Sequence, residues 1–254
     1  MSGQLENLGA ETALLWDAGC SGIAQEGDEV VAYFEGFEEP VALPLEGFWE
    51  TVPETDYLTA YYAGLEPVPF EQLIVAPTHC RVAPGETRRV LWLDPGMAFG
   101  TGHHATTYLA LAALERLDLT GKRVLDVGAG SGILTIAADL LGAAAAHGLD
   151  IDPLTLPVAE ENRALNGSSA TFQQGTLDDI SETFDVVTAN LFAELHVALA
   201  ADYRRVLRPG GWLLATGILD EKLALAQAAV AAQFTVYGVE HREEWALIVA
   251  RRAV

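Results

Sequence analysis

The sequence is poor in cysteine and has no long uninterrupted apolar run. Cys20 and Cys80 are the only cysteines in 254 residues, so a disulfide framework is not expected. No apolar run reaches the ~18 residues that a membrane span needs. The N-terminus also lacks the basic stretch followed by an apolar stretch that marks a signal peptide. We therefore expect a cytoplasmic protein without membrane association.

Positive charge is also scarce. Lysine and arginine total 14 against 36 aspartates and glutamates, which gives a net charge of −22. Such a charge repels phosphate backbones, so direct binding to nucleic acid is not expected. It attracts basic proteins instead, although solubility alone would also explain an acidic composition.

The feature around which the rest of the chain is organised is the stretch from Val124 to Leu134. It consists of a short apolar strand, a glycine-rich turn and the start of a helix, which is the adenosine-cofactor corner of a doubly wound sheet. The glycines follow the pattern G-x-G-x-G, and Ile133 stands where the dinucleotide fingerprint has its third glycine. This spacing favours a methyltransferase over a nicotinamide-dependent oxidoreductase, which remains the alternative from another enzyme class.

Strands and helices alternate from Arg123 onward, as in a parallel sheet with helices on both faces. The last two strands are joined by too few residues for a parallel crossover, so they should form an antiparallel hairpin at the sheet edge. The predicted strands are 123–127, 147–151, 170–174, 184–189, 211–217, 234–239 and 245–250, and the predicted helices are 133–141, 154–166, 193–207 and 221–232. The sequence thus predicts an α/β fold with a seven-stranded sheet.

The upstream part of the chain divides into three segments. Residues 1–55 predict a small α+β domain, with a helix over about 5–16, a β-prone run at 30–34 and a weaker one at 41–43. Residues 56–70 predict a linker helix. The domain that carries the chemistry is predicted to span 71–254. It should open with strands at 73–76, 79–82 and 89–93, and continue through a loop with glycines, histidines and threonines into a helix over 108–117.

Polar residues stand where the predicted strands end, which is the edge at which parallel sheets bind ligands. Asp150 is placed to accept hydrogen bonds from both hydroxyls of a ribose, with helix capping as the alternative. Asp152 is better explained as the cap of the following helix. For Asp178 and Asp179, contact with an adenine amino group and an ordinary loop position are equally good interpretations.

Asn190 follows the predicted strand 184–189. It is the main candidate for the residue that contacts the group to be modified. Its amide oxygen can accept a hydrogen bond from a substrate N–H, and capping of the next helix is the alternative. His103 and His104 are adjacent and point apart on extended backbone, so no metal site is expected. Either histidine can bond a substrate or cofactor as a neutral imidazole, or be a loop residue without chemistry.

Four stretches together resemble the PrmA-type methyltransferases, which modify ribosomal large-subunit protein eleven with S-adenosylmethionine. The resemblance runs from about Asp94 to the C-terminus. It implies a Rossmann-like methyltransferase domain, a linker helix, and a small ferredoxin-like N-terminal domain that recognises the substrate. That domain usually opens with a strand, whereas this chain starts almost at the first helix, as a truncated version would. The four stretches are 99–104, 128–132, 150–152 and 190–196.

The resemblance also assigns the site residues and the reaction. Thr107, Gly128, Asp150 and Asn190 match cofactor-binding positions, and the loop from Phe99 to His104 matches a segment that closes over the cofactor. Gly130 joins this set as part of the same glycine-rich turn. Asn190 is assigned to orient the acceptor amine, with His104 assisting.

The implied activity is methyl transfer from S-adenosylmethionine to lysine ε-amines, the N-terminal α-amine, or both, of a basic ribosomal protein. A different basic protein is the alternative substrate. We expect the enzyme to be a monomer.

Overall fold

The structure is a computed structural model of the whole chain. It describes residues 65–83, 85–94 and 102–254 and, of the first 64 residues, 14–15, 18, 20, 22–26, 29–34 and 49. The chain divides into two compact units, Met1–Ala60 and Tyr61–Val254. The predicted domain boundaries at 55 and 70 remain predictions. The linker helix remains a prediction over 56–64, which lie outside the described residues. Over 65–70 it is wrong, because that stretch is not helical and contains a short strand, β3 (Val68–Pro69).

The first unit contains an antiparallel hairpin of strands β1 (Gly22–Glu26) and β2 (Glu29–Tyr33). The strand β2 corresponds to the β-prone run predicted at 30–34. The other predictions for this unit, a helix over about 5–16 and a weak strand at 41–43, fall wholly or mostly outside the described residues.

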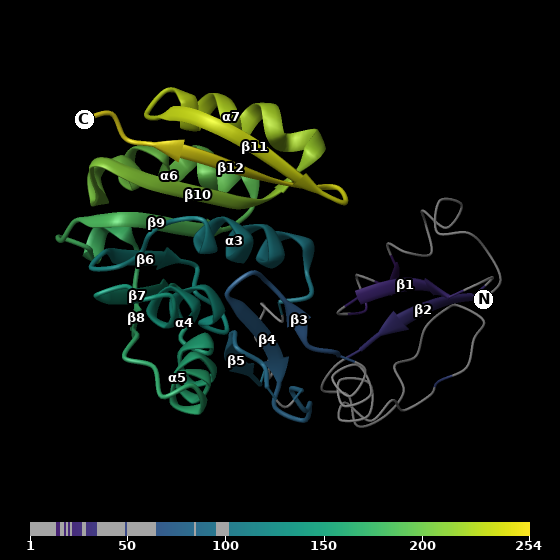
Figure 1. Cartoon of the computed structure of the whole chain (residues 1–254). Helices are drawn as coiled ribbons and strands as arrows, with labels where there is room; N and C mark the ends of the chain where they lie inside the picture. Colours follow the sequence, from purple (N-terminus) through teal and green to yellow (C-terminus); the bar gives the residue numbers. More distant parts are fainter. Residues whose placement is uncertain are drawn as a thin grey trace. The chain divides into compact units, whose positions relative to one another are not determined.

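The second unit is built on a seven-stranded sheet in the order β11-β12-β10-β9-β6-β7-β8 (Figure 1). The strands from β10 to β8 run parallel, whereas β12 is antiparallel to both β10 and β11. This arrangement confirms the predicted doubly wound sheet with an antiparallel hairpin at one edge. The strands are β6 (Arg123–Val127), β7 (Ala145–Asp150), β8 (Thr171–Gln174), β9 (Phe184–Asn190), β10 (Leu207–Leu219), β11 (Thr235–Arg242) and β12 (Trp245–Arg251).

Helices cover both faces of this sheet (Figure 1). Helices α3 and α4 pack on one face, where α5 lies beside α4, and helices α6 and α7 pack on the other. Their bounds are α3 (Ala105–Glu115), α4 (Ile133–Leu140), α5 (Thr155–Leu165), α6 (Ala193–Val206) and α7 (Leu223–Ala231). None of the helices in the described part of the chain is both long and apolar enough to cross a membrane.

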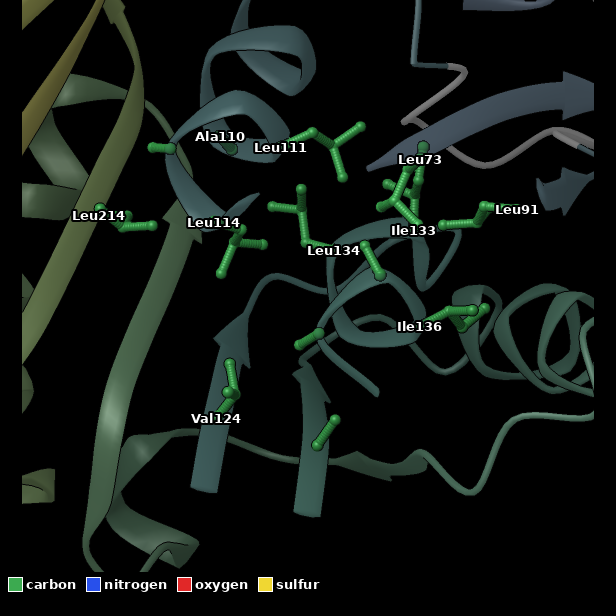
Figure 2. Close-up of a cluster of buried hydrophobic side chains, with 14 of the residues drawn as sticks. Leu73, Leu91, Ala110, Leu111, Leu114, Val124, Ile133, Leu134, Ile136 and Leu214 are labelled. Carbon is green, nitrogen blue, oxygen red and sulfur yellow. The ribbon is translucent and has the colours of Figure 1, made fainter. Parts of the chain in front are cut away.

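The core consists of two clusters, one on each face of the sheet. Neighbouring residues of a strand point to opposite faces, so Val124 joins the cluster under α3 and α4 while Leu125 joins the cluster under α6 and α7. Figure 2 shows the first cluster, in which Leu111 and Leu134 extend from their helices. Because both faces are covered, the central strands are continuous apolar runs rather than alternating ones.

A separate three-stranded sheet precedes α3, with β3 (Val68–Pro69), β4 (Leu73–Pro77) and β5 (Arg89–Leu93) in that order. The strand predicted at 79–82 is wrong. Pro77 ends β4, and its carbonyl accepts the N–H of Cys80 at 2.9 Å to close a turn. Because β4 and β5 are parallel, the chain between them has to cross over and cannot form a hairpin.

Candidate cofactor and acceptor site

The carboxyl ends of β6 and β9 lie side by side in the middle of the sheet. Val127 in β6 pairs with Ala189 in β9, while β7 pairs with the other side of β6. The chain therefore changes direction across the sheet between these strands, and such switch points are where open α/β sheets bind ligands. Gly128 follows β6 and Asn190 ends β9, so these two predicted site residues flank the switch point.

The glycine-rich turn uses backbone conformations that favour glycine. Gly128, Gly130 and Gly132 have φ angles of 78°, 52° and 80°, which other residues adopt only with strain. A Cβ on Gly128 would lie 2.6 Å from a methyl carbon of Leu191, in the segment after β9. Helix α4 then begins at Ile133 without a side-chain cap, so its first N–H groups are available to an anionic or polar ligand.

Asp150 holds this turn in place. One of its carboxylate oxygens accepts the N–H of Gly130 at 2.8 Å, and the other accepts the N–H of Asp152 at 3.0 Å. Each oxygen retains a further lone pair, so the predicted bond to a ribose stays a prediction that this geometry permits. The predicted capping by Asp152 is wrong, because the N-cap residue of α5 is Leu154, without a side-chain hydrogen bond. Asp152 instead accepts the N–H of Leu154 at 2.9 Å, in the turn just before the helix.

The two carboxylates after β8 have different environments. Asp179 accepts the N–H of Thr176 at 2.8 Å and completes the capping box of a 3₁₀ turn, Leu177–Asp179. Asp178 is exposed. The loop interpretation therefore describes Asp179, while contact with an adenine amino group stays a prediction for Asp178.

Asn190 is half-buried and does not cap the following helix. Helix α6 has Phe192 as its N-cap residue, without a side-chain hydrogen bond. Space for the Asn190 amide depends on Gly217, where a Cβ would lie 2.9 Å from the Asn190 side-chain oxygen and 2.5 Å from the Leu191 carbonyl oxygen. The capping alternative is therefore wrong, and contact of the amide with a substrate stays a prediction.

A buried carboxylate supports the site from inside the sheet. Asp126 in β6 is 1% exposed and accepts the hydroxyls of Thr135 and Thr188, each at 2.8 Å. The pKa of Asp126 is raised to about 6, chiefly by burial and also by the nearby Asp150, although the two hydroxyls act against this. These bonds tie α4 and β9 to the strand that leads into the glycine-rich turn.

The two adjacent histidines bond in different directions. His104 is the N-cap residue of α3, and its Nδ1 lies 2.8 Å from the hydroxyl oxygen of Thr106. The Nε2 of His103 lies 2.7 Å from the carbonyl oxygen of Glu66. Assistance by His104 in catalysis stays a prediction, and Phe99 lies outside the described residues.

Thr107, on the first turn of α3, is fully buried, yet its hydroxyl oxygen has no hydrogen-bond partner among the described residues. The segment that leads into α3 approaches α4, because a Cβ on Gly102 would lie 3.5 Å from Ile133. The beginnings of the two helices therefore lie near each other. A buried hydroxyl without a partner costs about 1–3 kcal/mol, which is compensated when a ligand bonds to it.

Sequence reasoning missed residues that support the site from a distance. Asn162 in α5 is fully buried, and its amide donates to the carbonyl of Ser131 in the glycine-rich turn at 2.9 Å. Thr188, which bonds Asp126, lies inside the mainly apolar strand predicted at 184–189. A polar residue inside an apolar run is the signal that could have identified Thr188, whereas Asn162 gives no such signal in a polar helix.

Comparison with known proteins gives a consistent result. A family model described as "Ribosomal protein L11 methyltransferase (PrmA)" matches residues 9–253. Proteins named ribosomal protein L11 methyltransferase from Deinococcus radiodurans and Thermus thermophilus are each 43% identical to this chain. The matches cover 99% of this chain in both cases, and 97% and 98% of the relatives. The similarity therefore extends well upstream of residue 94.

A solved structure is also similar. The crystal structure of ribosomal protein L11 methylase from Lactobacillus delbrueckii subsp. bulgaricus aligns with a TM-score of 0.70 and 32% identity. The alignment covers 75% of this chain and the whole of that one.

Proposed function

The chain belongs to the PrmA family of ribosomal protein L11 methyltransferases, and from this premise we propose that it methylates ribosomal protein L11 on amines. The donor is S-adenosylmethionine, and the acceptors are lysine ε-amines, the N-terminal α-amine, or both. The glycine-rich turn alone left a nicotinamide-dependent oxidoreductase open as an alternative. Membership of this family decides in favour of a methyltransferase.

The residues at the switch point fit this cofactor. The glycine-rich turn keeps side chains away from a close ligand, and Asp150 has lone pairs for ribose hydroxyls. The buried Thr107 hydroxyl has no partner in the part of the chain that the structure describes, and a polar ligand atom would supply one. When bound, the cofactor supplies a methyl group on a sulfonium, which is already a strong electrophile. The chain's own task is therefore mainly to position the two reactants.

The position of Asn190 is the observation that carries the proposal. Its amide ends β9 next to the glycine-rich turn, is not used as a helix cap, and has room because residue 217 is glycine. The amide oxygen can accept an N–H of the acceptor amine and so direct the nitrogen lone pair. The amine must first be neutral, which is easier for an α-amine, with a pKa near 8, than for a lysine, with a pKa of about 10.4.

Recognition of the substrate is assigned to the small N-terminal domain, residues 1–55, with 56–70 as linker and 71–254 as the methyltransferase domain. The division of the chain near residue 60 supports this assignment. The net charge of −22 supports a basic protein rather than nucleic acid as the partner. A monomer acting in the cytoplasm completes the proposal.

The proposal is tested with labelled S-adenosylmethionine and free ribosomal protein L11, followed by mass spectrometry. We expect mass gains in steps of one methyl that map to amines. Asn190→Ala should lower turnover about 100-fold, because a misdirected acceptor loses the advantage of orientation. Asn190→Asp, which keeps an acceptor oxygen, should retain more activity than Asn190→Ala.

Circular dichroism and thermal unfolding are the controls for the fold of both variants. Near-normal turnover of a folded Asn190→Ala variant would remove Asn190 from the acceptor site. Cofactor binding by the wild-type protein without methyl transfer to L11 would leave the methyltransferase domain in place and assign it a different basic protein.

A further inference from the structure

A buried imidazole that the mechanism above does not use lies beneath the segment after β9. His196 is on the first turn of α6 and is fully buried. Its Nε2 lies 2.8 Å from the carbonyl oxygen of Thr216 in β10. Because a carbonyl oxygen only accepts, Nε2 must carry the proton and donate.

The second ring nitrogen of His196 is also occupied. The hydroxyl oxygen of Tyr203, two turns further along α6, lies 3.3 Å from Nδ1. In the neutral ring this nitrogen accepts, so Tyr203 is the donor. Burial lowers the pKa of His196, which keeps the ring neutral, although its backbone hydrogen bonds act in the opposite direction. The bond from Nε2 to the Thr216 carbonyl thus fixes the tautomer of the neutral ring.

The carbonyl of Thr216 connects this imidazole to the acceptor side of the site. The same oxygen also accepts the N–H of Leu191 at 2.9 Å, and Leu191 is the residue that follows Asn190. The next residue, Phe192, accepts the backbone N–H of His196 at 3.3 Å. The segment from Asn190 to Phe192 is therefore held by one shared carbonyl and by the start of α6.

Thr216 itself lies at an irregular point of β10. The register between β10 and β12 shifts between Ala215 and Ile218, and the hydroxyl of Thr216 donates to the carbonyl of Ala246 at 3.0 Å. Irregularities of this kind change the direction of groups near active sites. A buried N–H donor at this point keeps the Thr216 carbonyl directed at the Asn190–Phe192 segment.

We propose that His196 is a positioning residue for methyl transfer, which acts through the Thr216 carbonyl to hold the Asn190–Phe192 segment. His196 does not touch the reactants. Its function is to fix the direction of the Asn190 amide. This inference rests on the proposed function, in which that amide orients the acceptor amine.

The test compares kcat with cofactor affinity in variants of position 196. His196→Leu removes the donor, and we expect kcat to fall by about tenfold or more, because small displacements at a site are costly. The affinity for S-adenosylmethionine should change by less than about twofold, because the glycine-rich turn is untouched. His196→Gln restores an N–H donor and should recover part of kcat.

Val206→Ala is the matched control for lost stability. Val206 is fully buried on the same helix. Its apolar side chain cannot form a hydrogen bond to the Thr216 carbonyl. We expect it to lower the melting temperature without lowering kcat. If His196→Leu does not fold, the double variant His196→Leu/Tyr203→Phe is used in its place. The second substitution removes the tyrosine hydroxyl that His196→Leu would leave buried without a partner.

Amide hydrogen exchange at Leu191 provides a readout that does not depend on activity. We expect exchange to be about tenfold faster in His196→Leu than in the wild type or in Val206→Ala, because the Thr216 carbonyl loses its support. Unchanged exchange and unchanged kcat in His196→Leu would overturn the inference, as would an equal fall of kcat in Val206→Ala. Absence of methyl transfer by the wild type would contradict the proposed function alone, and the exchange measurement would still decide the role of His196.

Discussion

At the scale of single residues, the site contains buried polar groups that do not stabilise the free protein. Asp126 is a carboxylate with a raised pKa inside the sheet, and the buried hydroxyl of Thr107 has no hydrogen-bond partner within the described ranges of the chain. Groups of this kind cost stability in the fold and are tolerated where function needs them. They permit predictions in which stability and binding change in opposite directions.

Thr107→Val tests this opposition directly. Removing an unpartnered buried hydroxyl should leave the free energy of unfolding unchanged or raise it by about 1 kcal/mol. Affinity for S-adenosylmethionine should fall about tenfold, the equivalent of one hydrogen bond. Calorimetry and chemical unfolding measure the two quantities.

The neighbouring Thr106→Val is the control for Thr107→Val. Thr106 is also buried, but its hydroxyl lies 2.8 Å from Nδ1 of His104 at the start of α3. We expect Thr106→Val to lower stability, with a smaller effect on cofactor affinity. If both variants behave alike, the Thr107 hydroxyl has no special relation to the cofactor.

Asp126 predicts a dependence of stability on pH. Its folded pKa of about 6 is above the ordinary 3.8, so the folded state holds this proton more tightly than the unfolded state. The stability contributed by the proton is complete below about pH 4 and is lost as pH rises through 6. The loss is roughly 3 kcal/mol.

Asp126→Asn removes this titration. The free energy of unfolding of the variant, minus that of the wild type, should therefore increase by roughly 3 kcal/mol between about pH 4 and about pH 7. Urea unfolding at several pH values measures the difference. Parallel stability curves for the two proteins would show that Asp126 titrates normally.

At the scale of elements, α5 links β5, the edge strand of the three-stranded sheet, to the glycine-rich turn. Asn166 bonds both backbone groups of Trp92 in β5, at 2.8 Å and 2.7 Å. Asn162, one turn earlier on the same face, accepts the N–H of Asp94 and donates to the carbonyl of Ser131. The two amides thus supply hydrogen-bond partners to the unpaired edge of β5, but only Asn162 also bonds the glycine-rich turn.

The two asparagines form a matched pair of variants. Asn162→Ala and Asn166→Ala should each lower the free energy of unfolding by about 1–3 kcal/mol, because buried backbone groups lose partners. Only Asn162→Ala should also weaken binding of S-adenosylmethionine, by about fivefold, since the Ser131 carbonyl loses its donor. An equal loss of affinity in both variants would indicate a general effect of stability.

At the scale of the whole molecule, charge is distributed unevenly along the chain. All 14 lysines and arginines lie after residue 80, so the first 80 residues carry acidic side chains and no basic ones except histidine. Attraction between this part and a basic substrate weakens in salt. We expect the KM for L11 to rise about tenfold from about 0.05 M to about 0.5 M NaCl.

Turnover at saturating L11 is the control for this salt effect. It should change little, because the charges act on encounter with the substrate rather than on the transfer step. A KM that is independent of salt would mean that the N-terminal part recognises its substrate without long-range electrostatics.

The sequence by itself determined the alternation of strands and helices from Arg123 onward and, to within one residue, the carboxyl ends of β6, β7, β8 and β9. Val124, Leu125 and Val127 of β6 are apolar because both faces of the sheet are covered, and the glycines at 128, 130 and 132 mark a turn that excludes side chains. These are local signals. Parallel pairing then brings Gly128 and Asn190 to one edge as a direct consequence of strand order.

Only the tertiary structure decided how these residues are held. The Asp126 carboxylate bonds a threonine 62 residues away, Asn162 bonds Asp94 across 68, and His196 bonds Thr216 across 20. No local pattern specifies such partners, because each depends on where the fold places two distant segments. The strand predicted at 79–82 failed for a local reason instead, because the turn that Cys80 closes on the Pro77 carbonyl follows β4 directly.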